Sequence, residues 1–193
     1  GFPEGAFQTL LVPGNEAAKI IEDPAIAAVT ITGSEFAGSK VAEACGKHLK
    51  KTVLELGGSD PFIVLADADL EKAVSTAVVA RMINDGQSCI AAKRFIVDQF
   101  IADDFVEQFK NAIEEKFVAG DPMDPETTLA PMARQDLLEE LHEQVMESVA
   151  LGAKIVIWGY QLDRPGSYYA PTILTDVTSN MPAFNEEFFG PVA

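Results

Sequence analysis

Two side chains of the sequence have the right types for covalent acyl chemistry, the thiol of Cys89 and the carboxylate of Glu55. Cys89 ends the polar run 84–89, and Glu55 lies in the segment Leu54-Glu55-Leu56-Gly57-Gly58. A cysteine can attack a carbonyl carbon, and a separate base can activate the water that later releases the acyl group. The pair therefore predicts an enzyme that forms a thioester and then hydrolyses it.

Glu55 is expected at the carboxyl end of a short apolar strand. A carboxylate inside such a strand costs free energy unless it is paired or neutralised, and this end of a strand faces the crevice where open α/β sheets bind ligands. Gly57 and Gly58 allow another backbone or a ligand to approach closely. These features favour a functional carboxylate. The alternative is an acid that simply reaches solvent where the strand ends.

Cys89 is expected on a loop, although free cysteines are more often small buried hydrophobes. The polar residues before it predict a turn after an amphipathic helix, and backbone N–H groups of such a turn can stabilise an oxyanion. Cys45 lies in a predicted helix without such a turn, and we interpret it as structural. A cysteine hydrolase without a cofactor is an alternative, but neither His48 nor His142 is close to Cys89 in sequence.

Two further segments have the composition of binding elements. The turn 33–38, Gly-Ser-Glu-Phe-Ala-Gly, follows a predicted strand and opens a predicted helix, and its free N–H groups suit a phosphate. Its glycine spacing differs from that of the dinucleotide fingerprint, and Ser34 is also a plain helix N-cap, a role compatible with the first. Segment 186–191 places acids and aromatics beside a Gly-Pro break, and a surface loop with buried phenylalanines is the alternative.

Composition narrows the class of protein. With 30 acidic and 14 basic residues the net charge is −16, which disfavours nucleic-acid and anionic-membrane partners. The 48% hydrophobic and 23% charged content is ordinary for a soluble globular protein. Two cysteines supply neither a disulfide framework nor a zinc site. With no signal peptide and no membrane-spanning stretch in the sequence, we expect a cytoplasmic protein without a metal.

The expected elements alternate between strands and helices, which is typical of an α/β domain with a mostly parallel sheet flanked by helices. Asp67 is expected to cap the helix that carries the apolar repeat 70–78. Segment 120–131 contains three prolines and is expected to be a loop. The expected strands are 28–32, 53–56, 61–65, 95–97, 154–157 and 168–173, and the other expected helices are 34–48, 100–117 and 135–149.

Taken in order, four motifs resemble signatures of the aldehyde dehydrogenase superfamily. They are the phosphate-binding turn 32–38, the glutamate motif 54–58, the cysteine motif 86–89 and the cofactor-contact motif 187–192. The similarity covers essentially all 193 residues. Within the superfamily, segments 57–65 and 87–95 are most similar to a microbial succinate-semialdehyde dehydrogenase group.

The resemblance implies a fold, a reaction and a cofactor. Residues 1–57 would be the C-terminal part of a Rossmann-like NAD(P)-binding domain, and residues 58–193 a catalytic domain incomplete at its C-terminus. Cys89 would attack a small aldehyde, succinate semialdehyde, to give a thiohemiacetal. Hydride would pass to NAD or NADP and leave a thioester, and Glu55 would activate the water that hydrolyses it.

The resemblance also assigns cofactor contacts and implies departures from the family. Gly33, Ser34 and Gly38 would hold the cofactor pyrophosphate; Leu56, Glu187 and Phe189 would complete the contacts. An upstream asparagine and lysine would belong to a longer enzyme, which we expect to be a homo-oligomer; the alternative is that this chain is a folded but catalytically silent module. Ile83 stands where the semialdehyde group carries a substrate-binding arginine, with Arg81 nearby, and Ala91 replaces a redox-switching cysteine.

Overall fold

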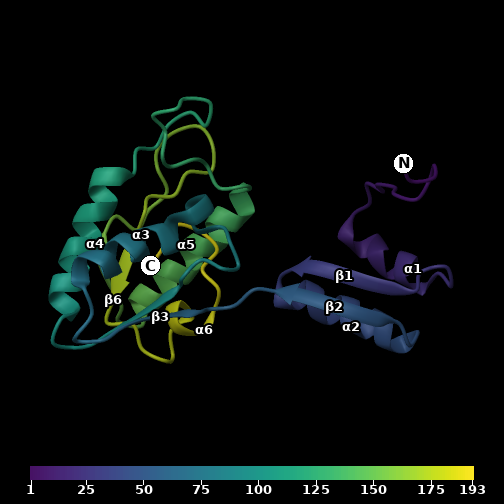
Figure 1. Cartoon of the computed structure of the whole chain (residues 1–193), viewed down its shortest axis with the longest axis horizontal. Coiled ribbons are helices and arrows are strands. Elements are labelled where there is room, and N and C mark those ends of the chain that lie inside the picture. The colour runs from purple at the N-terminus through teal and green to yellow at the C-terminus, as the bar shows by residue number, and fades with distance from the viewer. The chain divides into compact units, whose positions relative to one another are not determined.

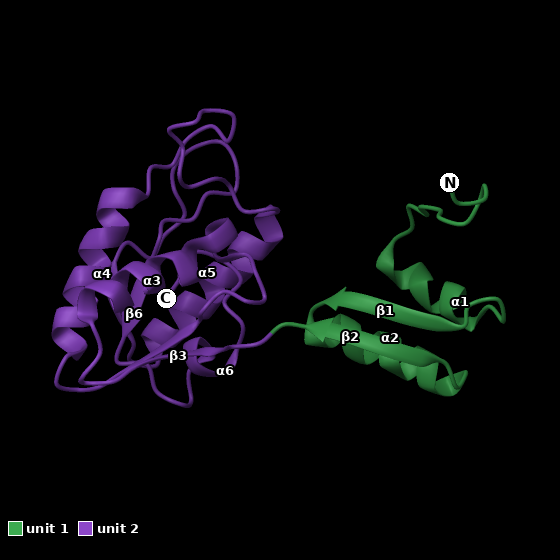
Figure 2. Cartoon of the chain, viewed as in Figure 1, with its two compact units in different colours: residues 1–57 green, residues 58–193 purple.

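The computed structural model describes residues 1–193, and the chain divides after Gly57 into two units (Figure 2). The first unit is Gly1–Gly57 and the second is Gly58–Ala193. Each unit has its own strands and helices. The α/β class with parallel strand pairs, expected from the sequence, is confirmed.

The first unit is built on a parallel pair of strands joined by a helix (Figure 1). Strand β1 (Ala28–Gly33) leads into α2 (Glu35–Lys47), which packs on both strands and returns the chain to β2 (Lys51–Leu56). A parallel pair needs such a crossover because its strands run in the same direction. The helix begins at a capped position, since Ser34 Oγ accepts a hydrogen bond from the Ala37 N–H at 3.2 Å. Before β1 lie the 3₁₀ turn η1 (Gly14–Glu16) and helix α1 (Ala17–Glu22).

The second unit contains two more strand pairs and four helices of one to four turns (Figure 1). Strands β3 and β4 are parallel, whereas β5 and β6 are antiparallel. The elements are β3 (Pro61–Val64), α3 (Leu70–Met82), the 3₁₀ turn η2 (Ile83–Gly86), β4 (Arg94–Val97), α4 (Ala102–Lys116), α5 (Gln135–Ala150), β5 (Lys154–Ile157), β6 (Ile173–Thr175) and α6 (Pro182–Asn185).

Two hydrophobic clusters hold the second unit together. One joins α3, α4 and the strands, and its aromatic centre is Phe95, whose ring lies 5.2 Å from that of Phe62 and 5.1 Å from that of Phe109. Such tilted aromatic pairs add to the stabilisation from buried area. The other cluster packs α5 against the C-terminal segment through Leu141, Phe188 and their neighbours. The acidic side chains of α5 lie on its exposed face, as expected for a solvated surface.

Two sequence expectations about these elements are wrong. The cap of α3 is Asp69 and not Asp67, since Asp69 Oδ1 accepts from the Lys72 N–H at 3.1 Å. The strand expected at 168–173 is instead β6 at Ile173–Thr175. Pro171 has no N–H to give to a ladder, so the chain on either side of it forms only isolated bridges, at Tyr169 before it and at Thr172 after it. No helix has the length and apolar character needed to cross a membrane.

Candidate active site

Cys89 lies exposed on a turn that follows η2 at the end of α3. Cys45, in contrast, is 1% exposed inside the core of the first unit. A thiol can act on a substrate only if the substrate can reach it, and of the two only Cys89 is placed for that. The positions expected for the two thiols, one on a loop and one in a helix, are those found.

The turn before Cys89 has a left-handed backbone. Asn84, Asp85 and Gly86 have φ values of 51°, 55° and 74° in succession. Asn, Asp and Gly are the residues that adopt this region at the lowest cost. Gly86 is also required by space, because a Cβ there would lie 2.0 Å from the backbone oxygen of Gly190. The composition of the turn therefore follows from its shape.

Arg81 holds this turn in place from the interior of the second unit. Its guanidinium is fully buried, and Nη2 lies 2.6 Å from the Gly86 carbonyl oxygen and 2.8 Å from that of Gly190. It also donates to the carbonyls of Ala92 and Phe188. Burial lowers the pKa of Arg81 to about 10, and the charge of Glu187 opposes that shift. Because its donors serve backbone carbonyls inside the unit, Arg81 is not available to bind a substrate carboxylate.

Lys93 is a second buried cation beside the turn 84–89, which we call the thiol turn. Its Nζ donates to the carbonyl oxygens of Ser88 at 3.3 Å, Cys89 at 3.1 Å and Ala91 at 3.0 Å. It also forms an ion pair with Glu187 Oε1 at 3.4 Å, and the lysine side chain is only 2% exposed. A buried ammonium needs both hydrogen-bond acceptors and a counter-charge. Here the thiol turn and Ala91 supply the hydrogen-bond acceptors, and Glu187 supplies the negative counter-charge.

Two side chains of the turn bind the segment that follows α4. Asp85 Oδ2 accepts from the Ala130 N–H at 3.2 Å, and Gln87 Oε1 accepts from the Ala133 N–H at 2.8 Å. Partial burial raises the pKa of Asp85 to about 6, although the bond from Ala130 opposes that shift. The turn is therefore fixed by its side chains as well as through its carbonyls.

The segment 187–190 is thus brought beside Cys89 although it lies about a hundred residues further along the chain. Phe188 is buried in the core, whereas Phe189 and Glu187 are half-buried. Glu187 Oε1 is a buried oxygen that forms no hydrogen bond, and its charge is paired with the Lys93 ammonium at 3.4 Å.

In the first unit, a second group of expected site residues meets at one edge. The register pairs Thr32 with Glu55 and Gly33 with Leu56, so the carboxyl ends of both strands lie together. The N-terminus of α2, capped by Ser34, begins at the same edge. Gly38 packs closely on Leu56, and a Cβ at this glycine would lie within 2.4 Å of the Leu56 side chain. Glu55 itself is exposed.

The structure therefore assembles the expected residues in two groups, one in each unit. Cys89, Glu187 and Phe189 belong to the second unit, and Glu55, Leu56 and the phosphate-binding turn belong to the first. Nowhere do three or more His, Cys, Asp or Glu side chains gather as metal ligands do.

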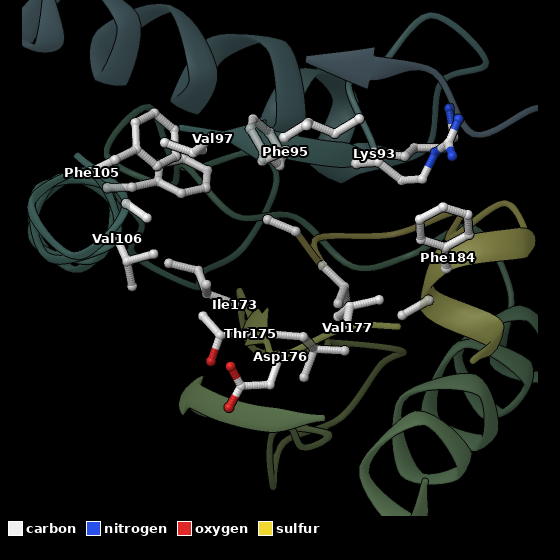
Figure 3. A pocket seen from close by; sticks show the side chains of 18 of the residues that line it. Lys93, Phe95, Val97, Phe105, Val106, Ile173, Thr175, Asp176, Val177 and Phe184 are labelled. Carbon is white, nitrogen blue, oxygen red and sulfur yellow. The ribbon is translucent and has the colours of Figure 1, made fainter. Parts of the chain in front are cut away.

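A cavity of about 540 Å³ also lies within the second unit, between β4, α4 and β6 (Figure 3). Its wall is largely aromatic and aliphatic, as the side chains of Phe95, Phe105 and Ile173 show in Figure 3. Lys93 reaches one end of it, but Cys89 is not among the lining residues. We therefore place the candidate active site at the thiol turn and not in this cavity.

Sequence reasoning missed the roles of Arg81, Lys93 and Asp85. The signals available were a charged residue in the apolar run 77–82 and a lysine four residues after the nucleophile. Neither reveals burial, because Arg81 binds carbonyls more than a hundred residues away and the counter-charge of Lys93 is Glu187, in the same distant segment. Only the assembled unit shows that these charges are internal.

These features agree with the match to a known family. The sequence pattern of the aldehyde dehydrogenase family matches residues 1–193, and the chain belongs to that family. Among curated proteins it is 54% identical to the succinate-semialdehyde dehydrogenase [NADP(+)] of Mycobacterium avium (strain 104), over 100% of the chain and 41% of that protein. It is 53% identical to the probable succinate-semialdehyde dehydrogenase [NADP(+)] of Synechocystis, over 100% of the chain and 42% of that protein.

Solved structures give the same result. The succinic semialdehyde dehydrogenase of Streptococcus pyogenes, in complex with NADP+, superposes with a TM-score of 0.90 at 39% identity. That comparison covers 95% of this chain and 40% of the other. The chain thus spans about two fifths of the length of the relatives it matches.

Proposed function

We propose that the protein oxidises a small aldehyde, succinate semialdehyde, to the acid with NADP or NAD, through a covalent adduct on Cys89. The observation that carries the proposal is an exposed cysteine on a rigid left-handed turn, in a chain that belongs to the aldehyde dehydrogenase family. The names of the Mycobacterium and Synechocystis relatives support the substrate and favour NADP. We assign Gly1–Gly57 to the cofactor-binding part and Gly58–Ala193 to the catalytic part.

In this reaction the Cys89 thiolate forms a bond to the aldehyde carbon, and the carbonyl oxygen becomes an oxyanion. The N–H of Cys89 donates no hydrogen bond within the chain and is therefore free to stabilise that oxyanion. Loss of hydride leaves a thioester on Cys89. Glu55 then takes a proton from water, whose oxygen attacks the thioester carbon, and the acid departs as the thiol reforms.

The residues present fit a nicotinamide cofactor. The first turn of α2, after Gly33 and the Ser34 cap, offers N–H groups that suit a pyrophosphate. Gly38 and Leu56 pack at the same edge, while Glu187 and Phe189 would contact the nicotinamide ribose. A carboxylate such as that of Glu187 can accept hydrogen bonds from ribose hydroxyl groups. When bound, the nicotinamide supplies the hydride acceptor.

Two substitutions in the full-length protein test the assignment. Cys89→Ala should abolish NADPH production from succinate semialdehyde, because no other group can form the adduct, and retained activity would refute the nucleophile. Glu55→Gln should leave a burst of NADPH followed by slow turnover, because only thioester hydrolysis needs the base. An equal loss of burst and turnover would remove Glu55 from that role.

A second candidate is that the 193-residue chain by itself is a folded but catalytically silent module. The observation that favours it is that the chain spans only about two fifths of the length of the relatives it matches. Calorimetric titration of this chain with NADP+ distinguishes the two. Binding at micromolar cofactor would contradict the silent module. For the whole enzyme we propose a homo-oligomer, and light scattering measures its mass directly.

A further inference from the structure

Lys93 forms hydrogen bonds with both of the peptide groups that flank Cys89. The Lys93 ammonium donates to the carbonyl oxygen of Ser88 at 3.3 Å and to that of Cys89 at 3.1 Å. In a trans peptide, the C=O and the N–H point in opposite directions across one plane. With both carbonyls aimed at the buried ammonium, the N–H groups of Cys89 and Ile90 must point away from it.

These two N–H groups are also without partners. Neither the Cys89 nor the Ile90 N–H donates a hydrogen bond within the chain, whereas the neighbouring Ala91 N–H donates to Ser88. Free N–H groups next to a nucleophile are the donors that stabilise an oxyanion, provided that their orientation is fixed before the reaction. Without Lys93, the Cys89 carbonyl would lose its one hydrogen bond, and the Ser88 carbonyl would keep only the bond from the Ala91 N–H at 3.1 Å. Both peptide planes would then be held less firmly.

We propose that Lys93 is a positioning residue that fixes the Ser88–Cys89 and Cys89–Ile90 peptide planes, so that the Cys89 N–H is presented to the oxyanion. Lys93 touches no reacting atom; it acts through the backbone. Three acceptors converge on its three N–H donors, at Ser88, Cys89 and Ala91, and Glu187 supplies the counter-charge. The proposal rests on the proposed function only in taking Cys89 as the nucleophile.

Two reactions of Cys89 separate this role from a merely structural one. With p-nitrophenyl acetate, the sulfur forms a bond to the acyl carbon through an oxyanion, and the C–O bond to p-nitrophenolate breaks. With iodoacetamide, the sulfur displaces iodide from a saturated carbon, so no oxyanion forms. Neither reaction needs a cofactor. Both rates are measured at the Cys89 peptide on one folded sample of the full-length protein. Because both reactions start from the same thiol, their ratio isolates the step that forms the oxyanion.

Lys93→Met should lower the acylation rate about a hundredfold, within the range for loss of one oxyanion donor, and leave alkylation within about threefold. Lys154→Met is the matched control, because Lys154 forms a surface ion pair with Asp176 at 2.7 Å, and its ratio should equal that of the wild type. A parallel fall of acylation and alkylation in Lys93→Met would overturn the proposal, and so would an unchanged ratio.

Lys93→Arg keeps the buried charge and provides a variant that decides the question if Lys93→Met does not fold. The planar guanidinium delivers its N–H bonds in one plane and cannot serve three carbonyls that converge on one point. We expect a lowered ratio, and a wild-type ratio in this variant would refute the role. If the wild type acylates but never oxidises aldehydes, the proposed function fails while this inference is still decided by the ratio.

Discussion

Gly86→Ala should destabilise the second unit by more than the backbone strain of an alanine at positive φ would alone. A Cβ at this position would lie 2.0 Å from the Gly190 oxygen and 2.5 Å from both the Gly190 carbon and Arg81 Nη2. The nearest atoms are backbone, so the turn and the 187–190 segment must separate by about 1 Å or more to reach ordinary contact distance. Arg81 then loses its bonds to Gly86 and Gly190, now 2.6 and 2.8 Å.

The magnitude follows from these losses. A hydrogen bond from a charged donor contributes about 1.5–3 kcal/mol, so the two bonds account for about 3–6 kcal/mol. The left-handed backbone adds about 1–2 kcal/mol, and the lower entropy of the unfolded chain offsets about 0.4–1 kcal/mol. The expected loss is therefore about 3–8 kcal/mol, a large part of the stability of a typical domain.

Gly152→Ala is the matched control for this prediction. Gly152 also has a positive φ, of 117°, but a Cβ there would meet only the end of the Met181 side chain, at 3.7 Å. We expect this control to cost about 1–3 kcal/mol, from backbone strain alone. Urea unfolding followed by the fluorescence of Trp158, the one tryptophan among the 193 residues, compares the two variants. Equal losses in both variants would refute the reasoning from the Gly190 contact.

The remaining predictions concern the carboxyl group of Asp85 and the cap of α3. Asp85 binds its proton more tightly in the folded protein than in the unfolded chain, since its pKa is raised to about 6 from the ordinary 3.8; stability should therefore fall as the pH rises from about 4 to about 6. Asp85→Asn should remove this dependence and, after allowance for the partial exposure of the carboxyl, add about 1 kcal/mol at about pH 8. Urea midpoints at several pH values measure both effects, and an unchanged pH dependence would contradict the assignment. Asp69→Ala should cost about 1 kcal/mol because it removes the cap of α3, whereas Asp67→Ala should stay within about 0.5 kcal/mol; equal effects in thermal unfolding would show that Asp69 is not the cap.

The local elements were largely predictable because their signals are local. Strand β5 occupies the expected residues 154–157, and Ser34 caps α2 as its position after β1 suggests. The cap of α3 was placed two residues early because both Asp67 and Asp69 have the right chemistry. The choice between them depends on the turn at 66–68, which sequence patterns do not resolve.

The candidate site residues were predictable from the sequence, but the buried cations that hold them in place were not. Motifs pointed to Cys89 and Glu187 separately, and the structure brings their segments together through Lys93. The sequence suggested Arg81 as a neighbour of the substrate-binding position, and the structure shows it turned inward to four backbone carbonyls. Burial of a cation depends on which distant carbonyls surround it, and no short pattern encodes that.

The bonds from Arg81 to Phe188 and Gly190 span 107 and 109 residues of the chain. Closing so long a loop carries an entropic cost that only the docked C-terminal segment can offset. During synthesis, the ribosome releases the thiol turn long before it releases Gly190. The nascent chain therefore carries an exposed cysteine on an unfixed turn until segment 187–190 has been made and has docked.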